Sequence, residues 1–383
     1  MGELVLDEYR LEKELGSGAF GKVMSAASTV TSELVAVKLE KRVKGRPQFL
    51  AAESQVLAAL QGAEGIPKLY GSGSYDHMIC MVMERLGPNL DSLFKQHDRH
   101  FEQRSILQIA LQGVERVQHV HSCFYMHRDI KPQNFMFGLA AQQTTLYIAD
   151  FGLAKKYQNG PHGMHVPYKE EKPFVGTACY ASLNTHLGVQ QSRRDDLESL
   201  IYVLCYLLQS HLPWQHKHRT REEKHNATRL LKMLTTGEEL FKGWHRGYAS
   251  AFTYIRSIGF DDTPDYALLK RTFRTIAAES RVALDLAFEW LPGQSRRHRH
   301  LKTQGKQDSF VLSDNGRRRS LSPSSATQLR VTMSALPVMP SLESSENTSY
   351  EGWEEEAKEE DEDTVKEAKG PTIDRRLLPV KSM

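Results

Sequence analysis

The stretch Tyr125-Met126-His127-Arg128-Asp129-Ile130-Lys131-Pro132-Gln133-Asn134, followed by Ala149-Asp150-Phe151-Gly152, decides the fold class of this chain. Asp129 can accept a proton from a hydroxyl group, and Lys131 can offset charge on a phosphoryl group in transit. Asn134 and Asp150 offer the oxygen ligands that Mg²⁺ prefers. We therefore predict a phosphoryl-transfer centre with the catalytic residues Asp129, Lys131, Asn134 and Asp150, of which Asn134 and Asp150 hold the metal.

A glycine-rich segment near the start of the chain predicts where a nucleotide's phosphates lie. Hydrophobic alternation on both sides predicts a strand, a turn and a second strand, and glycine lets the backbone approach phosphate oxygens that a Cβ would block. A dinucleotide-binding fingerprint has the same glycine spacing, but its last glycine opens a helix. Val23 and the Ser/Thr-rich run 28–32 favour a hairpin instead. The ATP contacts predicted here are Leu15, Gly16, Ser17, Gly18, Ala19, Phe20, Gly21, Lys22 and Val23.

A strand that ends on a lysine follows the glycine-rich segment. Val35-Ala36-Val37-Lys38 alternates and projects Lys38, as expected of the lysine that grips the α- and β-phosphates. Its expected partner is Glu53, in a helical stretch from Phe49 to Leu60 with a stripe of apolar residues. The alternative is that Lys38 and Glu53 are ordinary surface charges. Their order relative to the other motifs favours the ion pair.

The adenine ring is expected against Val23, Ala36 and Met136, with backbone hydrogen bonds from Glu84-Arg85-Leu86. Met83 would stand at the back of this pocket. A methionine in an apolar run is more often core filling, but Gly87-Pro88 follows directly and suits a hinge. The predicted ATP site thus also includes Ala36, Lys38, Glu53, Met83, Glu84, Leu86 and Met136, and the expected cofactors are ATP and Mg²⁺.

From about Tyr9 to Trp290 the chain resembles the casein kinase I family of serine/threonine protein kinases. Most protein kinases end the activation segment with Ala-Pro-Glu, whereas this chain has Ser182-Leu183-Asn184, close to the family's Ser-Ile-Asn. Further similar segments are His186-Leu187-Gly188, Ser192-Arg193-Arg194-Asp195-Asp196-Leu197-Glu198-Ser199, Leu212-Pro213-Trp214-Gln215 and Phe260-Asp261-Asp262-Thr263-Pro264-Asp265-Tyr266. The resemblance implies ATP-dependent phosphorylation of serine or threonine in proteins. It also implies that Asp196 opens the central helix and holds the backbone of the catalytic loop.

The expected fold class is α+β, in the bilobal form of protein kinases. Residues 1–8 form an N-terminal extension, 9–86 a β-rich small lobe with one helix, and 87–292 a mainly helical large lobe. The stretch from Leu197 to Leu208 is apolar nearly all round and about three turns long, which predicts a buried helix rather than a membrane span.

One substitution bears on substrate choice. The family favours targets preceded by acidic or already phosphorylated residues, which a basic pocket near the activation segment contacts. Its Gly-Thr-Ala-Arg-Tyr segment is here Gly176-Thr177-Ala178-Cys179-Tyr180, so Cys179 removes a guanidinium, the group best shaped for phosphate. Lys224 falls near another anion-contacting position of the family. We therefore expect protein substrates with acidic or phosphorylated residues, and a weakened preference for the phosphorylated ones.

The composition changes after about residue 293. Residues 293–383 are first basic, then Ser-rich, and the part from Glu343 to Lys369 has twelve acidic residues against three lysines. Such a tail is expected to be disordered. It is expected either to fold back over the substrate groove or to act only as a solvated tail.

The remaining expectations concern partners and location. The formal net charge is +3, but the acidic part contributes −9, so the rest is basic. Its basic runs lack interleaved aromatic residues, so nuclear import is favoured over specific nucleic-acid binding. No signal peptide or membrane span is evident, and the four cysteines have no paired spacing, so we expect a cytoplasmic protein that can also enter the nucleus. We also expect a monomer. Two rival functions are a scaffolding pseudokinase, which the intact catalytic set disfavours, and a small-molecule kinase, which the casein kinase I segments disfavour.

Overall fold

The computed structural model describes residues 4–18, 21–43, 48–215 and 220–291. The predicted disordered tail, residues 293–383, lies outside the described residues, as do Ala19 and Phe20 of the glycine-rich segment.

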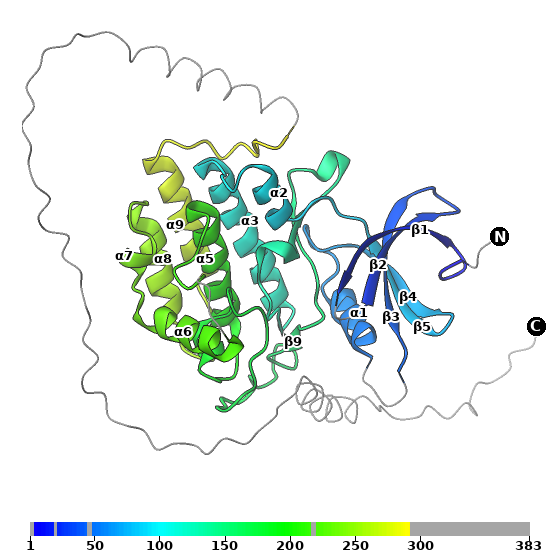
Figure 1. Cartoon of the computed structure of the whole chain (residues 1–383), viewed down its shortest axis with the longest axis horizontal. Coiled ribbons are helices and arrows are strands. Elements are labelled where there is room, and N and C mark those ends of the chain that lie inside the picture. Colours follow the sequence, from blue (N-terminus) through cyan, green and yellow to red (C-terminus); the bar gives the residue numbers. More distant parts are fainter. Residues whose placement is uncertain (1–3, 19–20, 44–47, 216–219, 292–383) are drawn as a thin grey trace, which may run out of the picture. The chain divides into compact units, whose positions relative to one another are not determined.

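The N-terminal part is a five-stranded antiparallel sheet in the order β1-β2-β3-β5-β4 (Figure 1). Its strands are β1 Tyr9–Gly18, β2 Gly21–Ser28, β3 Leu34–Lys41, β4 Leu69–Tyr75 and β5 Met78–Glu84. One helix, α1 Phe49–Ala59, packs against β3, β4 and β5. The glycine-rich segment therefore joins two strands, and the dinucleotide-binding alternative, which needs a helix there, is wrong.

The register of the sheet aligns the predicted nucleotide contacts. Lys38 on β3 lies opposite Val23 on β2, and Ala36 lies opposite Met83 on β5. Strand side chains alternate between the two faces of a sheet, so Ala36 and Lys38, two residues apart, point to the same face. Gly21 has φ +127, and a Cβ there would lie 2.0 Å from the carbonyl oxygen of Leu39. This close approach explains why glycine is needed at that position.

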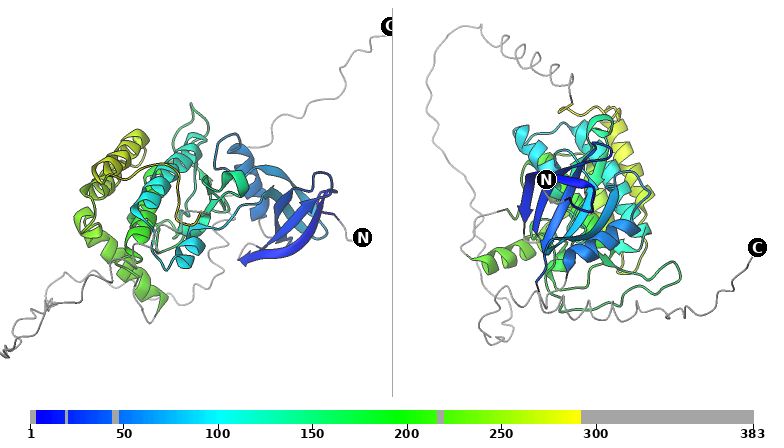
Figure 2. Two further views of the ribbon diagram at one scale, coloured as in Figure 1. Left: turned by 90° about the horizontal axis from the view of Figure 1, so that it is seen from above. Right: turned by 90° about the vertical axis from the view of Figure 1, so that its right-hand side faces the viewer.

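The C-terminal part is mainly helical, and further views place the sheet at one end of the described domain and most helices at the other (Figure 2). The helices are α2 Leu90–Gln96, α3 Gln103–Ser122, α4 Leu183–His186, α5 Arg193–Gln209, α6 Arg221–Leu234, α7 Gly237–Leu240, α8 Arg246–Ser257 and α9 Tyr266–Glu279. Short strands β6 Tyr125–Met126, β7 Phe135–Phe137, β8 Leu146–Ile148 and β9 Lys155–Lys156 carry the loops of the site, with 3₁₀ turns at Pro132–Asn134 and Ala140–Gln142. The expected α+β bilobal fold is confirmed.

Helix α5 is the central helix of this lobe. Every residue from Leu197 to Leu208 is buried, as the apolar run predicts. The helix begins earlier, at Arg193, where the N–H of Ser192 donates to Asp195 Oδ2 at 2.7 Å and fixes the start of the first turn. Asp196 therefore lies within the first turn rather than at the first position. Among the described residues, no helix has both the length and the apolarity needed to cross a bilayer.

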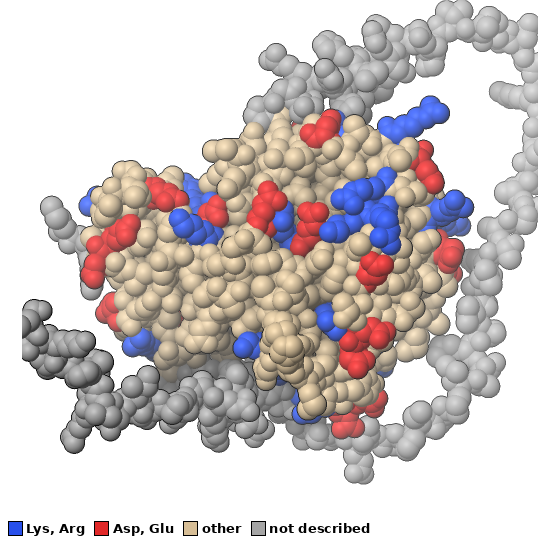
Figure 3. Space-filling view, turned by 180° about the vertical axis from the view of Figure 1, so that it is seen from behind, with Lys and Arg blue, Asp and Glu red and all other residues tan. Residues whose placement is uncertain are grey.

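The charged side chains of the domain are of both signs. On the face seen from behind, Lys and Arg side chains lie beside Asp and Glu side chains (Figure 3). Neither sign covers this face alone.

Candidate active site

A buried lysine and two carboxylates meet between β3, α1 and the segment after β8. Lys38 Nζ lies 2.6 Å from Glu53 Oε2 and 3.2 Å from Asp150 Oδ1. The lysine side chain is 11% exposed and the glutamate side chain 4%. The alternative that Lys38 and Glu53 are ordinary surface charges is therefore wrong. Burial lets a pair of this kind fix the position of the lysine, because water cannot replace either partner.

Three shifted pKa values belong to this cluster. Burial disfavours the charge on Lys38, but Glu53 and Asp150 outweigh it and raise the pKa of the lysine. Burial alone would raise the pKa of Asp150, yet the charges of Lys38 and His127 outweigh it and lower that pKa below its ordinary value. For Glu53, burial outweighs the attraction of Lys38 and the pKa is raised. The cluster thus holds a firmly charged cation beside an ionised Asp150.

Asp129 is the second centre of the site, and it is 7% exposed. Its Oδ2 accepts a hydrogen bond from Lys131 Nζ, and its Oδ1 accepts one of 2.7 Å from Thr177 Oγ1. Asn134 Nδ2 donates to the carbonyl oxygen of Asp129 at 2.9 Å. The carboxylate is therefore oriented from two sides. Thr177 was not predicted from the sequence, where its segment was interpreted only through Cys179.

The catalytic loop is held from below by Asp196 of α5, as the family resemblance implies. Its carboxylate accepts the backbone N–H groups of His127 at 2.7 Å and Arg128 at 2.8 Å. His121 Nε2 lies 2.9 Å from Asp196 Oδ2. Burial would raise the pKa of Asp196, but the hydrogen bonds and charges of His121 and His127 together outweigh it and the pKa is lowered. Arg128 has φ 66, a conformation unfavourable for a residue with a Cβ, so this loop is held in place by its surroundings.

Asn134 and Asp150 fit the predicted magnesium site. The amide nitrogen of Asn134 is used by Asp129, which leaves Oδ1 as a possible ligand. The two residues are tied through Ala149, whose N–H donates to the carbonyl oxygen of Asn134 at 2.9 Å. The side chain of Asp150 is 40% exposed, so its carboxylate can reach an incoming ion. Carboxylate and amide oxygens, completed by phosphate oxygens and water, match the coordination of Mg²⁺.

The glycine-rich residues predicted to contact the phosphates lie at the end of the β1–β2 hairpin. Gly16 pairs with Val23, Ser17 with Lys22 and Gly18 with Gly21 in the β1–β2 hairpin. The outer end of this hairpin is exposed: the side chain of Leu15 is 43% exposed, and Lys22 forms a surface ion pair with Glu14. Met136 lies on β7 opposite Tyr147 of β8, and it also pairs with Asn89 in an isolated antiparallel β-bridge.

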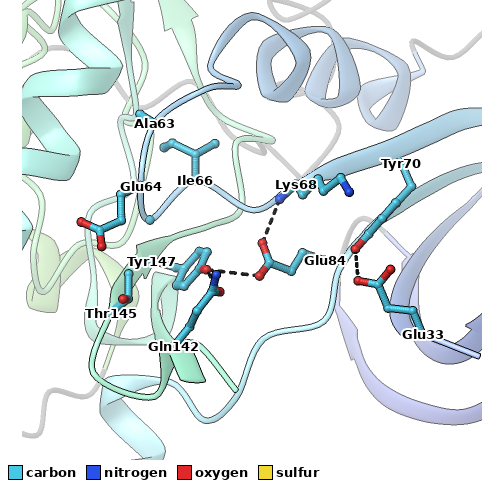
Figure 4. Close-up of a pocket in the computed structure, with 11 residues that line it drawn as sticks. Glu33, Ala63, Glu64, Ile66, Lys68, Tyr70, Glu84, Gln142, Thr145 and Tyr147 are labelled. Atoms are coloured by element: carbon cyan, nitrogen blue, oxygen red, sulfur yellow. Dashed lines mark hydrogen bonds between the residues drawn. The ribbon is translucent and has the colours of Figure 1, made fainter. Parts of the chain in front are cut away.

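Glu84 contributes less to the predicted hinge than expected. Its backbone N–H already donates to the carbonyl oxygen of Lys68 at 2.8 Å, so it is not free for a purine. Its side chain lies in a separate cavity of about 410 Å³ (Figure 4), where it accepts hydrogen bonds from Tyr147 Oη at 3.2 Å and Lys68 N at 3.1 Å. The carbonyl oxygen of Glu84 and the backbone of Arg85 and Leu86 stay the predicted contacts for adenine.

The surroundings of Cys179 and Lys224 bear on substrate choice. Gln215 Nε2 donates to Cys179 Sγ at 3.1 Å, and Trp214 Nε1 donates to the carbonyl oxygen of Cys179 at 2.7 Å. Burial raises the pKa of the thiol, while the positive charges of Lys232 and Lys224 act in the opposite direction. Lys224 is exposed on α6, so an accessible cation lies near the activation segment.

The geometry can be compared with known families. The arrangement unites a glycine-rich hairpin, a lysine–glutamate ion pair, a catalytic-loop aspartate and a second aspartate after β8. The family model described as the protein kinase domain matches residues 9–275, which is more than half of the chain. With the motifs, the fold and the site in agreement, we conclude that this chain belongs to the protein kinase domain family.

Proposed function

We infer that this protein kinase is a serine/threonine kinase of casein kinase I type that uses Mg·ATP. The observation that carries the inference is the carboxylate of Asp129. It is fixed by Lys131 and Thr177, in the same site as the Lys38–Glu53 pair and Asp150. Phosphoryl transfer demands alignment and charge neutralisation more than covalent chemistry, and this arrangement supplies both.

The residues divide the chemistry between them. Lys38, held by Glu53, would grip the α- and β-phosphates. A magnesium ion on Asn134 and Asp150 would neutralise phosphate charge. The hydroxyl oxygen of the acceptor forms the new bond to the γ-phosphorus, the bond from phosphorus to the β,γ-bridging oxygen breaks, and ADP leaves. Asp129 orients the hydroxyl and takes its proton, while Lys131 offsets charge on the transferred group.

Support for the casein kinase I type comes from how its signature residues are used. Ser182 Oγ donates to Asp195 Oδ1 at 2.6 Å, and Asn184 Nδ2 donates to the same oxygen at 3.1 Å. The N–H of Leu183 donates to Glu198 Oε1 at 2.9 Å, and this oxygen also pairs with Arg256 at 2.8 Å. The Ser-Leu-Asn segment thus attaches the end of the activation segment to the start of α5. The residues that carry the resemblance fix the substrate side of the site.

The proposed substrates carry acidic or phosphorylated residues before the target. Lys224 would contribute one cation to their recognition, whereas the side chain of Cys179 has no cationic form, and burial, which raises its pKa, keeps it a neutral thiol. A phosphate would therefore gain less over a carboxylate here than in a site that also has an arginine. The kinase therefore accepts substrates that already carry a phosphorylated residue, but it prefers them less strongly over acidic substrates.

Four matched peptides test this proposal. They share one sequence and differ in the acceptor, which is serine or tyrosine, and in the position three residues before it, which is aspartate or phosphoserine. We expect transfer to serine only, abolished by Asp129→Asn, and a gain in the phosphoserine preference on Cys179→Arg. Transfer to tyrosine, or near wild-type turnover in Asp129→Asn, would contradict the proposed function. An equal preference in wild type and Cys179→Arg would contradict the role given to Cys179.

A further inference from the structure

Lys232 on α6 is a fully buried lysine far along the chain from the catalytic motifs. Its relative exposure is 0%, although lysine is almost never fully buried unless it is paired. Among the described residues no carboxylate forms an ion pair with Lys232. Glu198 is the carboxylate whose charge acts most on Lys232, and it pairs with Arg256 instead, at 2.8 Å. Burial lowers the pKa of Lys232 to about 7, which shows how strongly this environment resists the charge. Because burying this charge is unfavourable for the stability of the fold, a functional role for Lys232 is favoured.

The ammonium group lies among acceptors that suit it. Lys232 Nζ donates to the carbonyl oxygens of Ala178, at 3.0 Å, and Ala181. His186 Nε2 lies 3.2 Å from Lys232 Nζ, but it also lies 3.0 Å from the carbonyl oxygen of Ala178, to which it can only donate, so it is not a third acceptor. The rings of Tyr202 and Trp214 lie 4.8 and 4.9 Å from the nitrogen, as in cation–π contacts. Two backbone carbonyl groups and two ring faces therefore surround the nitrogen, without a counter-ion among the described residues.

The two carbonyl groups belong to the segment that reaches the catalytic aspartate. Thr177, which donates to Asp129 Oδ1, also accepts the N–H groups of Tyr180 and Ala181 at its carbonyl oxygen, both at 2.9 Å. Residues 177–181 thus form one compact turn, which we call the substrate turn. The turn lies in an irregular segment that is followed by the four-residue helix α4. Its backbone groups have no helix or sheet partners, so side chains must supply their hydrogen bonds.

We propose that Lys232 is a positioning residue of the substrate site, which holds the substrate turn by two backbone carbonyls so that Thr177 stays on Asp129 and the acceptor segment finds a preformed surface. The inference rests on the proposed function, since it assigns the turn to the protein substrate. Lys232 does not touch the reacting atoms. It acts through Ala178, Ala181 and Thr177.

A purely structural role gives a different expectation. Replacing a buried charge by an apolar side chain of similar volume is often neutral or stabilising for the fold. If Lys232 only filled space, methionine would serve as well, and neither the substrate turn nor peptide phosphorylation would change. A positioning role requires that the turn loosen and peptide use suffer while nucleotide binding is kept, because Lys38, Glu53 and Asp150 are held independently.

The test compares Lys232→Met, which removes charge and donors, with Lys232→Gln, which keeps donors without charge. Lys242→Met, at an exposed lysine after α7, is the matched control for loss of one positive charge. Full-length proteins are assayed at pH 6.5, below the pKa of about 7, where Lys232 is charged. For Lys232→Met we expect kcat/KM for the serine peptide to fall at least about tenfold, while Kd for Mg·ATP stays within about twofold. Lys232→Gln should lose less, and Lys242→Met should match wild type.

Amide hydrogen exchange gives a readout that needs no activity. Exchange at residues 177–182 should accelerate in Lys232→Met, with the amides of β3 unchanged. Wild-type peptide kinetics in Lys232→Met, or unchanged exchange in the substrate turn, would overturn the proposal. If neither variant folds, Lys232 is a determinant of the fold and the positioning role is rejected. If wild type phosphorylates no peptide, the proposed function fails, and exchange alone still decides whether Lys232 holds the turn.

Discussion

Replacing Lys38 by methionine tests whether the ion pair at the centre of the site is the buried structure described above. The change removes the partner of Glu53, whose side chain is 4% exposed, and leaves Asp150 without its hydrogen bond of 3.2 Å. An isolated carboxylate at such depth takes up a proton rather than stay charged. The cost of this proton sets the size of the effect. With an ordinary pKa of 4.5 for Glu53, and about 1.36 kcal/mol per pH unit, protonation costs about 3 kcal/mol at pH 7 and less than about 1 kcal/mol at pH 5. Wild type already bears part of this cost, because burial raises the pKa of Glu53 there too, so the difference between the two proteins is smaller.

The sign of the pH dependence follows from the same group. In the variant the folded-state pKa of Glu53 lies above its unfolded value, so the folded protein binds more protons between these two values. Protonated Glu53 then stabilises the folded variant fully below pH 4.5, and this contribution is lost as pH rises through the folded-state pKa of Glu53. The destabilisation of Lys38→Met relative to wild type should therefore grow between pH 5 and pH 7.

Urea unfolding followed by fluorescence at both pH values measures this difference. The control is Lys22→Met, which breaks the exposed ion pair with Glu14, whose side chains are 64% and 43% exposed. Exposed pairs contribute about 0–1 kcal/mol, so the control should lose little, and equally at both pH values. A loss in Lys38→Met that is no larger than in Lys22→Met, or that is the same at pH 5 and pH 7, would refute the reasoning.

The remaining predictions concern Asp150, Thr177 and Asp195. Asp150→Asn should lower peptide turnover at least about 100-fold while far-UV circular dichroism stays that of wild type, because it weakens metal binding without touching the core. Thr177→Val should lower kcat about 10–100-fold with an unchanged Kd for Mg·ATP, the effect of losing a hydrogen bond to a charged group of about 1.5–3 kcal/mol; equal kcat would remove its orienting role. Burial raises the pKa of Asp195 from 3.8 to about 6, so its stabilising contribution is complete below pH 3.8 and is lost as pH rises through about 6. The free energy of unfolding of Asp195→Asn, measured in urea, should therefore rise by about 3 kcal/mol relative to that of wild type between pH 4 and pH 7. The same pH dependence of unfolding in both proteins would contradict this.

The residues that could be predicted from the sequence are those whose roles follow their order along the chain. Lys38 and Glu53 form the expected ion pair, and Asp129 shares its site with Asn134. The bounds of α1, Phe49–Ala59, nearly match the predicted stretch because its apolar stripe marks the buried face. The apolar run predicts a start of α5 that is too late, since the helix begins where Asp195 accepts the N–H of Ser192, before the first apolar residue.

What could not be predicted depends on contacts between distant segments. Thr177 reaches Asp129 across 48 positions, and no local pattern marks such a hydrogen bond. The side chain of Glu84 turns to Tyr147 on β8 because the pairing of β3 with β5 decides which side chains face the nucleotide. Lys232 left one visible signal, a single lysine within the apolar run 230–234 of an amphipathic helix. An amphipathic pattern alone does not distinguish a buried lysine from one at the edge of the apolar face.

Two buried charges of opposite sign hold the two irregular segments of the site. Asp196 accepts backbone N–H groups from the catalytic loop, and Lys232 donates to backbone carbonyl groups of the substrate turn. In both segments these backbone groups lie outside helices and strands. Their backbone groups still need partners, and a buried ion gives stronger hydrogen bonds than a neutral side chain. One side chain thus connects each helix to its segment: Asp196 connects α5 to the catalytic loop, and Lys232 connects α6 to the substrate turn. For this reason a neutral replacement at Lys232 should loosen the substrate turn and leave the nucleotide site intact.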